Sequence, residues 1–232
     1  MAPRPTKSRT SLSSRKGATR VVRHDVREEI QRRILSGESK PGERLSQQSL
    51  ARELGVAQGT VRESLMELQW LGLVESIDRL GVFVEKLDVG RICEAYMVRE
   101  VIEGLAARLA CRAASRDDIS ELKSMAERIY ALAQEDDAET ATLDRSFHLH
   151  ITELTNNDTL LRLSKTYRAL GMTVRAFREP AVIYSEHMKI VEAIEHNFAE
   201  EAERQARLHV LGAREMIEAQ AKLGQFAPQW VK

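Results

Sequence analysis

Apolar residues recur every three or four positions in three segments near the start of the 232-residue chain. This spacing predicts helices over about residues 22–36, 46–54 and 58–71, each followed by a glycine that favours a helix end. The pattern then changes to two short runs, LVES and VFVE, on either side of residues 78–81. Apolar runs of this length around a turn predict the two strands of a hairpin.

From residue 87 onward the apolar positions keep helical spacing, and no run predicts a strand. The pattern is interrupted at Ser115, at Asn156–Asn157, at Pro180 and at Ser185. This predicts an all-α bundle of six to seven helices whose core is built from Leu, Ile, Ala and Met. The expected helices span about residues 89–114, 117–135, 138–155, 158–178, 186–196 and 199–223.

The two patterns divide the chain into two domains, each long enough for its own core. Helix, turn, helix and hairpin is the order of a winged helix-turn-helix, whose second helix enters the DNA major groove. We therefore predict a mainly α protein, with a winged helix-turn-helix DNA-binding domain at residues 22–86 and an all-α domain at residues 87–224. Residues 1–21 and 225–232 are predicted to be tails.

The charge distribution supports a polyanionic partner for the first domain. The chain has no net charge, but residues 1–86 hold 16 Lys and Arg against 11 Asp and Glu. Residues 4–23 contain seven basic residues and no acidic one, and they are rich in Ser, Thr and Pro. This composition predicts a disordered tail, which either adds non-specific phosphate contacts or is only a solvated leader.

The sequence gives no indication of a membrane or secreted protein. No apolar run approaches the roughly 20 residues of a membrane-spanning helix, and no signal peptide is visible. Cys93 and Cys111 fit reduced thiols in helical cores. We therefore predict a cytoplasmic protein with no membrane partner.

Four motifs follow one another in residues 41–85: PGERL, SLAxxLGV, TVRESLxxLxxxGLVE and GVFVE. In this order they resemble the DNA-binding domain of GntR-type transcription regulators. One four-residue segment departs from the family, which usually has Ser-Arg-Thr-Pro where this chain has Ala57, Gln58, Gly59 and Thr60. An arginine that commonly reads guanine is thereby a glutamine, which suits adenine. The resemblance implies DNA contacts for Arg44, Gln58, Gly59, Thr60, Arg62 and the wing residue Gly81.

A candidate metal site lies in the helical domain. Asp144 and His148, at i and i+4, share one helix face. His187 and His209 lie eleven residues before and after Phe198, so a chain reversal there would bring both imidazoles level. One carboxylate and three imidazoles form a ligand set suited to Zn²⁺, Ni²⁺, Mn²⁺ or Fe²⁺. Ordinary core or surface histidines are the alternative, which spacing alone leaves open.

The same domain carries RxxxE from Arg99, DxxFH from Asp144, a histidine before IVEAI, and RLH from Arg207. These motifs resemble the FCD effector domain, which follows the winged helix in the FadR-type branch of the GntR family. The resemblance implies that the aspartate and the three histidines above hold a divalent ion, with Zn²⁺ as the first choice. It also implies that the domain senses a small carboxylate or sugar-acid effector.

Two arginines are predicted effector contacts, because a guanidinium binds a carboxylate through two parallel hydrogen bonds. They are Arg99 and Arg175. The alternative for Arg99 is an intrahelical ion pair with Glu103.

These features predict a ligand-responsive transcriptional regulator, a repressor, that binds operator DNA as a homodimer. No catalytic residue is assigned. A metal-dependent hydrolase or lyase is an alternative that uses the same Asp and His site to activate water. No second carboxylate stands at a spacing suited to a general base, which weighs against an enzyme. A metal sensor, in which the ion itself is the signal, is the other alternative.

Overall fold

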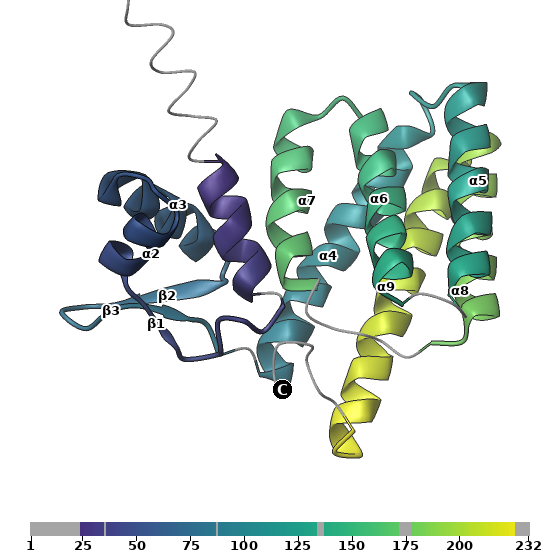
Figure 1. The fold of residues 1–232 in the computed structure, drawn as a ribbon. Helices are drawn as coiled ribbons and strands as arrows, with labels where there is room; N and C mark the ends of the chain where they lie inside the picture. The colour runs from purple at the N-terminus through teal and green to yellow at the C-terminus, as the bar shows by residue number, and fades with distance from the viewer. Residues whose placement is uncertain (1–23, 35, 87, 134–136, 172–177, 226–232) are drawn as a thin grey trace, which may run out of the picture. The chain divides into compact units, whose positions relative to one another are not determined.

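The computed structural model contains two compact units, Met1–Lys86 and Leu87–Lys232 (Figure 1). The N-terminal tail expected at residues 1–21 lies outside the described residues. The residues that the structure describes are 24–34, 36–86, 88–133, 137–171 and 178–225.

The first unit is a winged helix-turn-helix. A helix over residues 24–34 is followed by β1 (Arg44–Leu45), α2 (Gln47–Glu53), α3 (Gln58–Trp70), β2 (Val74–Ile77) and β3 (Gly81–Val84). The strands form an antiparallel sheet in the order β1-β3-β2.

The sheet corrects one detail of the sequence prediction. A two-stranded hairpin was expected, and residue 44 belonged to none of the expected helices or strands. In the structure Arg44 lies in β1, opposite Phe83 of β3, so the wing has a third strand. A strand of two residues carries no apolar alternation that a sequence pattern could reveal.

The predicted apolar faces form the core of this unit. In the first helix, Val26, Ile30 and Ile34 are buried at four-residue spacing. Ser46 caps helix α2, because its hydroxyl accepts a hydrogen bond from the Ser49 amide at 3.3 Å. Helix α3 buries one face against this core and leaves its other face exposed. The buried side chains of α3 are Val61, Ser64, Leu65 and Leu68.

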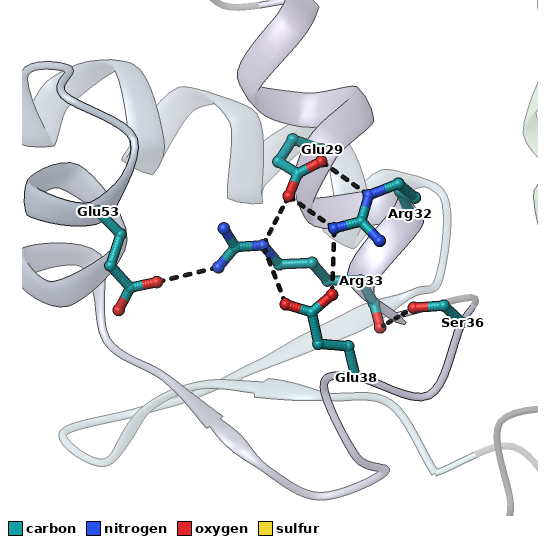
Figure 2. A network of polar contacts seen from close by, with 6 residues as sticks. All are labelled: Glu29, Arg32, Arg33, Ser36, Glu38 and Glu53. Carbon is teal, nitrogen blue, oxygen red and sulfur yellow. Dashed lines mark hydrogen bonds and ion pairs between the residues drawn. The ribbon is translucent and has the colours of Figure 1, made fainter.

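A network of charged side chains joins the first helix to α2 (Figure 2). Arg33 donates to Glu29 at 2.8 Å and to Glu53 of α2 at 2.9 Å. Hydrogen bonds from Arg32 and Arg33 lower the pKa of Glu29 to about 2. Water and salt screen exposed ion pairs of this kind, so the buried apolar face supplies most of the packing energy.

The second unit is an all-α bundle, as the apolar spacing predicts. Helix α4 packs against α6, α7, α8 and α9, and α5 packs against α6 and α8. The core between them includes the fully buried Phe147, Leu122 and Ile190. The helices of this unit in the described residues are α4 (Val89–Ala110), α5 (Arg116–Leu132), α6 (Asp137–Leu154), α7 (Asp158–Gly171), α8 (Pro180–Glu195) and α9 (Ala199–Lys222).

Two features of α8 position the candidate site. The helix begins at Pro180, six residues before the expected start, because proline needs no amide partner at the first helical position. The sequence pattern had predicted interruptions at Pro180 and at Ser185, with a helix only from residue 186. At its other end, α8 is followed by a tight turn through Asn197, which has a φ of 57°, and α9 then starts at Ala199. This turn makes α8 and α9 a hairpin.

The start of α5 gives a test of the fold. Ser115 and Asp118 form a capping box, in which each side chain binds the other residue's backbone amide. We expect Ser115→Ala to lower the free energy of unfolding of the helical unit by about 1 kcal/mol, measured by urea denaturation. Ser120→Ala is the matched control, because Ser120 is exposed within the same helix and alanine is at least as good a helix former there. Equal losses in both variants would contradict a role for the cap.

Candidate metal centre and nucleic-acid interface

The residues predicted to contact DNA lie on α3 and on the wing sheet. Gln58, Gly59 and Arg62 are exposed in the first two turns of α3, and Thr60 is half-buried beside them. Ala57 caps this helix without a side-chain hydrogen bond. Apart from the adjacent residues and the backbone of its own helix, no heavy atom of the described residues lies within 4 Å of the position that a Cβ on Gly59 would take. The fold itself therefore gives no steric reason for a glycine at this point of the helix.

Arg44 and Gly81 are neighbours on the wing. Gly81 has a φ of 116°, in the region that favours glycine, and it pairs with Ile77 across the hairpin. A Cβ at Gly81 would lie 3.1 Å from Nε of Arg44. Gly81 thus leaves room for the Arg44 side chain to lie along the start of β3.

The four candidate metal ligands converge in the helical unit. Asp144 and His148 come from α6, His187 from α8 and His209 from α9. One potential ligand atom of each lies within 4.8 Å of those of the other three. The three imidazoles are buried, and the Asp144 side chain is 32% exposed. The turn between α8 and α9 brings His187 and His209 level, with ring centroids 4.7 Å apart.

The cluster has the size and chemistry of a metal site. Zinc–nitrogen bonds of about 2.0–2.1 Å separate the ligands of a tetrahedral site by about 3.4 Å. In the structure, Nε2 of His187 lies 3.4 Å from Oδ1 of Asp144, and Nε2 of His148 lies 4.0 Å from Oδ2. These residues therefore fit a divalent ion after small side-chain movements.

His187 is the most strongly buried member of the cluster. Its side chain is fully buried, stacks on Phe147 at 4.3 Å, and makes no hydrogen bond within the described residues. Burial, reinforced by His209, His148 and Arg178, holds the pKa of His187 well below its ordinary value. The ring is therefore neutral near pH 7, which is the form that binds metal.

Two glutamates contact the Nδ1 atoms of His148 and His209. Oε2 of Glu103 lies 3.1 Å from Nδ1 of His148, and Oε2 of Glu186 lies 2.8 Å from Nδ1 of His209. A carboxylate only accepts hydrogen bonds, so Nδ1 of His209 carries the proton in its hydrogen bond to Glu186, and Nε2 of His209 keeps its lone pair. Glu103 lies at ion-pair distance from His148. Burial favours the protonated form of Glu186, but His209 and Arg178 hold its pKa below the ordinary value.

The arginine predictions have different outcomes. Arg175 lies outside the described residues. The Nε of Arg99 donates to Glu103 at 2.9 Å, and its guanidinium lies 4.8 Å from the ring centroid of Tyr96. The structure thus contains the ion pair that was the alternative for Arg99, and its contact with an effector stays a prediction.

The sequence interpretation missed Glu186 and Arg178. Arg178 pairs with Glu186 and donates to the backbone carbonyl of His209 at 3.3 Å. Glu186 comes directly before His187 but faces His209, which is 23 residues further along the chain. No local spacing reveals such a pairing. A carboxylate next to a candidate ligand was the only available signal.

Comparisons with known proteins identify both units. Residues 23–84 match the family described as "Bacterial regulatory proteins, gntR family", and residues 94–212 match the FCD domain. The chain belongs to the GntR family. A winged helix followed by an FCD domain is the domain order of its FadR-type branch. The chain is thus a DNA-binding transcriptional regulator and not an enzyme, and the hydrolase or lyase alternative is set aside.

Two relatives illustrate this membership of the GntR family. The chain is 30% identical over 198 residues to the "Probable D-xylose utilization operon transcriptional repressor" of Paenarthrobacter nicotinovorans, covering 82% of this chain and 86% of the relative. It is also 30% identical over 144 residues to the "Nta operon transcriptional regulator" of Aminobacter aminovorans. That alignment covers 60% of this chain and 65% of the relative.

A solved structure supports the GntR-type fold. The structure of E. coli McbR/YncC matches with a TM-score of 0.66 at 22% identity, covering 88% of this chain and 97% of that one. Within the described residues, no helix combines the length and apolarity required to cross a membrane.

The Arg99–Glu103 pair of this GntR regulator gives a test of the site's electrostatics. We expect Glu103→Ala to lower the free energy of unfolding of the metal-free helical unit by about 3–5 kcal/mol, because it removes the partner of a guanidinium whose side chain is only 14% exposed. The double substitution Arg99→Met with Glu103→Leu should cost much less, since it buries no unpaired charge. Chemical denaturation in the presence of a chelator measures both values.

Glu195→Ala, which breaks the exposed ion pair with Lys123, is the control and should have little effect. The expectation fails if the double variant is as unstable as Glu103→Ala alone.

Proposed function

We propose that this GntR-family protein is a repressor whose helical domain holds a divalent metal ion and responds to a small organic acid. The observation that carries the proposal is the convergence of four potential ligand atoms within 4.8 Å in the FCD unit. Asp144, His148, His187 and His209 would hold the ion. Zn²⁺ is our first choice, with Ni²⁺, Mn²⁺ and Fe²⁺ as alternatives, because this mixed set of nitrogen and oxygen ligands suits all four metals.

The ion would also recognise the effector. A metal that prefers five or six ligands keeps open positions after binding four protein groups, and it attracts the oxygen atoms of a carboxylate or sugar acid. Asp144 is the one partly exposed ligand, so the cluster is reached from its side. The guanidinium of Arg99 is already paired with Glu103, which favours the ion as the main anchor. Arg99 and Arg175 remain secondary effector contacts in this proposal.

The DNA-binding unit would read its operator through α3 and the wing. We assign base or phosphate contacts to Gln58, Gly59, Thr60 and Arg62, because residues near the start of a recognition helix face the major groove. Arg44 and Gly81 would contact DNA from the wing. One recognition helix spans few base pairs, so specific affinity favours a homodimer on two half-sites.

Regulation would follow from differential binding. An effector that binds one arrangement of the bundle more tightly than another shifts the protein towards or away from its DNA-binding arrangement. The relative from Paenarthrobacter is named a probable repressor, and we extend repression relieved by the effector to this chain. A protein that binds operator DNA in this way would act in the cytoplasm.

A pure metal sensor is the second candidate, and the same cluster supports it. The two candidates differ in what changes DNA binding. Gel-shift assays on an operator enriched from random duplex DNA, with metal alone and with metal plus a panel of organic acids, separate them. Release that requires an acid supports the proposal, and release by metal alone supports the sensor.

The metal assignment predicts a specific loss. We expect His148→Ala to reduce the metal content of the purified protein several-fold, measured by elemental analysis. It should also remove the rise in melting temperature that added Zn²⁺ produces, because binding to the folded state adds stability. His150→Ala is the matched control on the same helix, since His150 does not belong to the cluster. Unchanged metal content in His148→Ala would refute the ligand assignment.

Gln58 predicts a change of DNA specificity. We expect Gln58→Arg to shift the preferred base at one position of each half-site from adenine to guanine, because arginine pairs with guanine O6 and N7. Sequencing of duplexes selected from a random pool measures the preference. Gln69→Arg is the control, since it adds the same charge near the exposed C-terminal end of α3. A shift of the same base in both variants would show that charge alone is responsible.

A further inference from the structure

Two of the three clustered imidazoles each contact a glutamate that is itself paired with an arginine. In one, Arg99 donates to Glu103 at 2.9 Å, and Glu103 lies 3.1 Å from Nδ1 of His148. In the other, Arg178 pairs with Glu186, and Glu186 lies 2.8 Å from Nδ1 of His209. In both cases the order of contacts is arginine, glutamate, histidine.

Arg178 contacts His209 in two ways, directly at its backbone and through Glu186 at its imidazole. Nη2 of Arg178 pairs with the glutamate that holds the imidazole, and Nη1 donates to the backbone carbonyl of His209 at 3.3 Å. Both ends of the histidine residue are therefore tied to one guanidinium. The side chain of Arg178 is only 9% exposed, so few competing waters reach these bonds.

A glycine makes room for this arginine. Gly212 lies three residues after His209 in α9, on the same helix face. A Cβ on Gly212 would lie 2.9 Å from Nη2 of Arg178, the atom that pairs with Glu186. Glycine within a helix is less favourable than alanine. The space that the guanidinium needs accounts for a glycine at this position.

We propose that Arg178, Glu186 and Gly212 are positioning residues that preset His209 for metal binding. Gly212 provides the space, Arg178 fixes the position of Glu186, and Glu186 accepts a hydrogen bond from the Nδ1–H group of His209, so that Nε2 keeps its lone pair for the cluster. Such outer partners orient a ligand and raise its basicity. The inference rests on the proposed metal centre and adds which residues set its affinity.

Gly212→Ala separates positioning from ordinary structural support. The added methyl group displaces the flexible end of Arg178 and deletes no charged or ligating group. We expect Zn²⁺ affinity, measured by chelator competition on the full chain, to fall about 10- to 100-fold. The absorption spectrum of bound Co²⁺ should change with it. The melting temperature of the metal-free protein should stay equal or rise, because alanine favours the helix.

Charge variants provide the second measurement. Glu186→Gln should weaken Zn²⁺ binding similarly, whereas Glu195→Gln, which alters the exposed pair with Lys123, should not. The inference is overturned if Gly212→Ala and Glu186→Gln keep wild-type Zn²⁺ affinity and Co²⁺ spectra. It is also overturned if Gly212→Ala lowers the metal-free melting temperature without a selective loss of affinity. Failure of the wild-type chain to bind any of Zn²⁺, Ni²⁺, Mn²⁺ and Fe²⁺ would overturn the metal centre itself, which distinguishes the two failures.

Discussion

Burial of polar side chains within a helical core is the constraint on which the sensing unit depends. A buried polar group without a partner costs free energy, so such groups need hydrogen bonds or a ligand. Here three imidazoles and one carboxylate gather among apolar side chains, with Phe147 stacked directly on His187. Glu186 meets this constraint for His209 through a hydrogen bond, and Glu103 lies at ion-pair distance from His148. In the proposed metal centre, an ion would occupy the inner side of the cluster.

The two units rely on different kinds of recognition. The winged helix presents exposed side chains on α3 and the wing, where contacts form only with a partner from outside. The bundle instead encloses its cluster, so a ligand bound there would contact residues of α6, α8 and α9 at once. Binding in the bundle can therefore be coupled to the arrangement of helices, which is the property that a regulator needs.

Much of this architecture could be predicted from residue spacing. Apolar periodicity predicted the helices, and equal distances from Phe198 placed His187 level with His209. The two-residue strand β1 was missed because it is too short for a pattern. The start of α8 was missed because Pro180 was interpreted as a break. Glu186 and Arg178 could not be predicted, since their pairing with His209 depends on how α8 and α9 pack.

The location of Asp144 and His148 on α6 has a mechanical consequence. Helix α6 packs chiefly against α4, α5 and α7, whereas α8 and α9 are already joined by a three-residue turn. An ion shared by all four ligands would act as a reversible cross-link between α6 and the α8–α9 hairpin. Loss of the ion would weaken the contact between α6 and the hairpin and leave the hairpin itself intact.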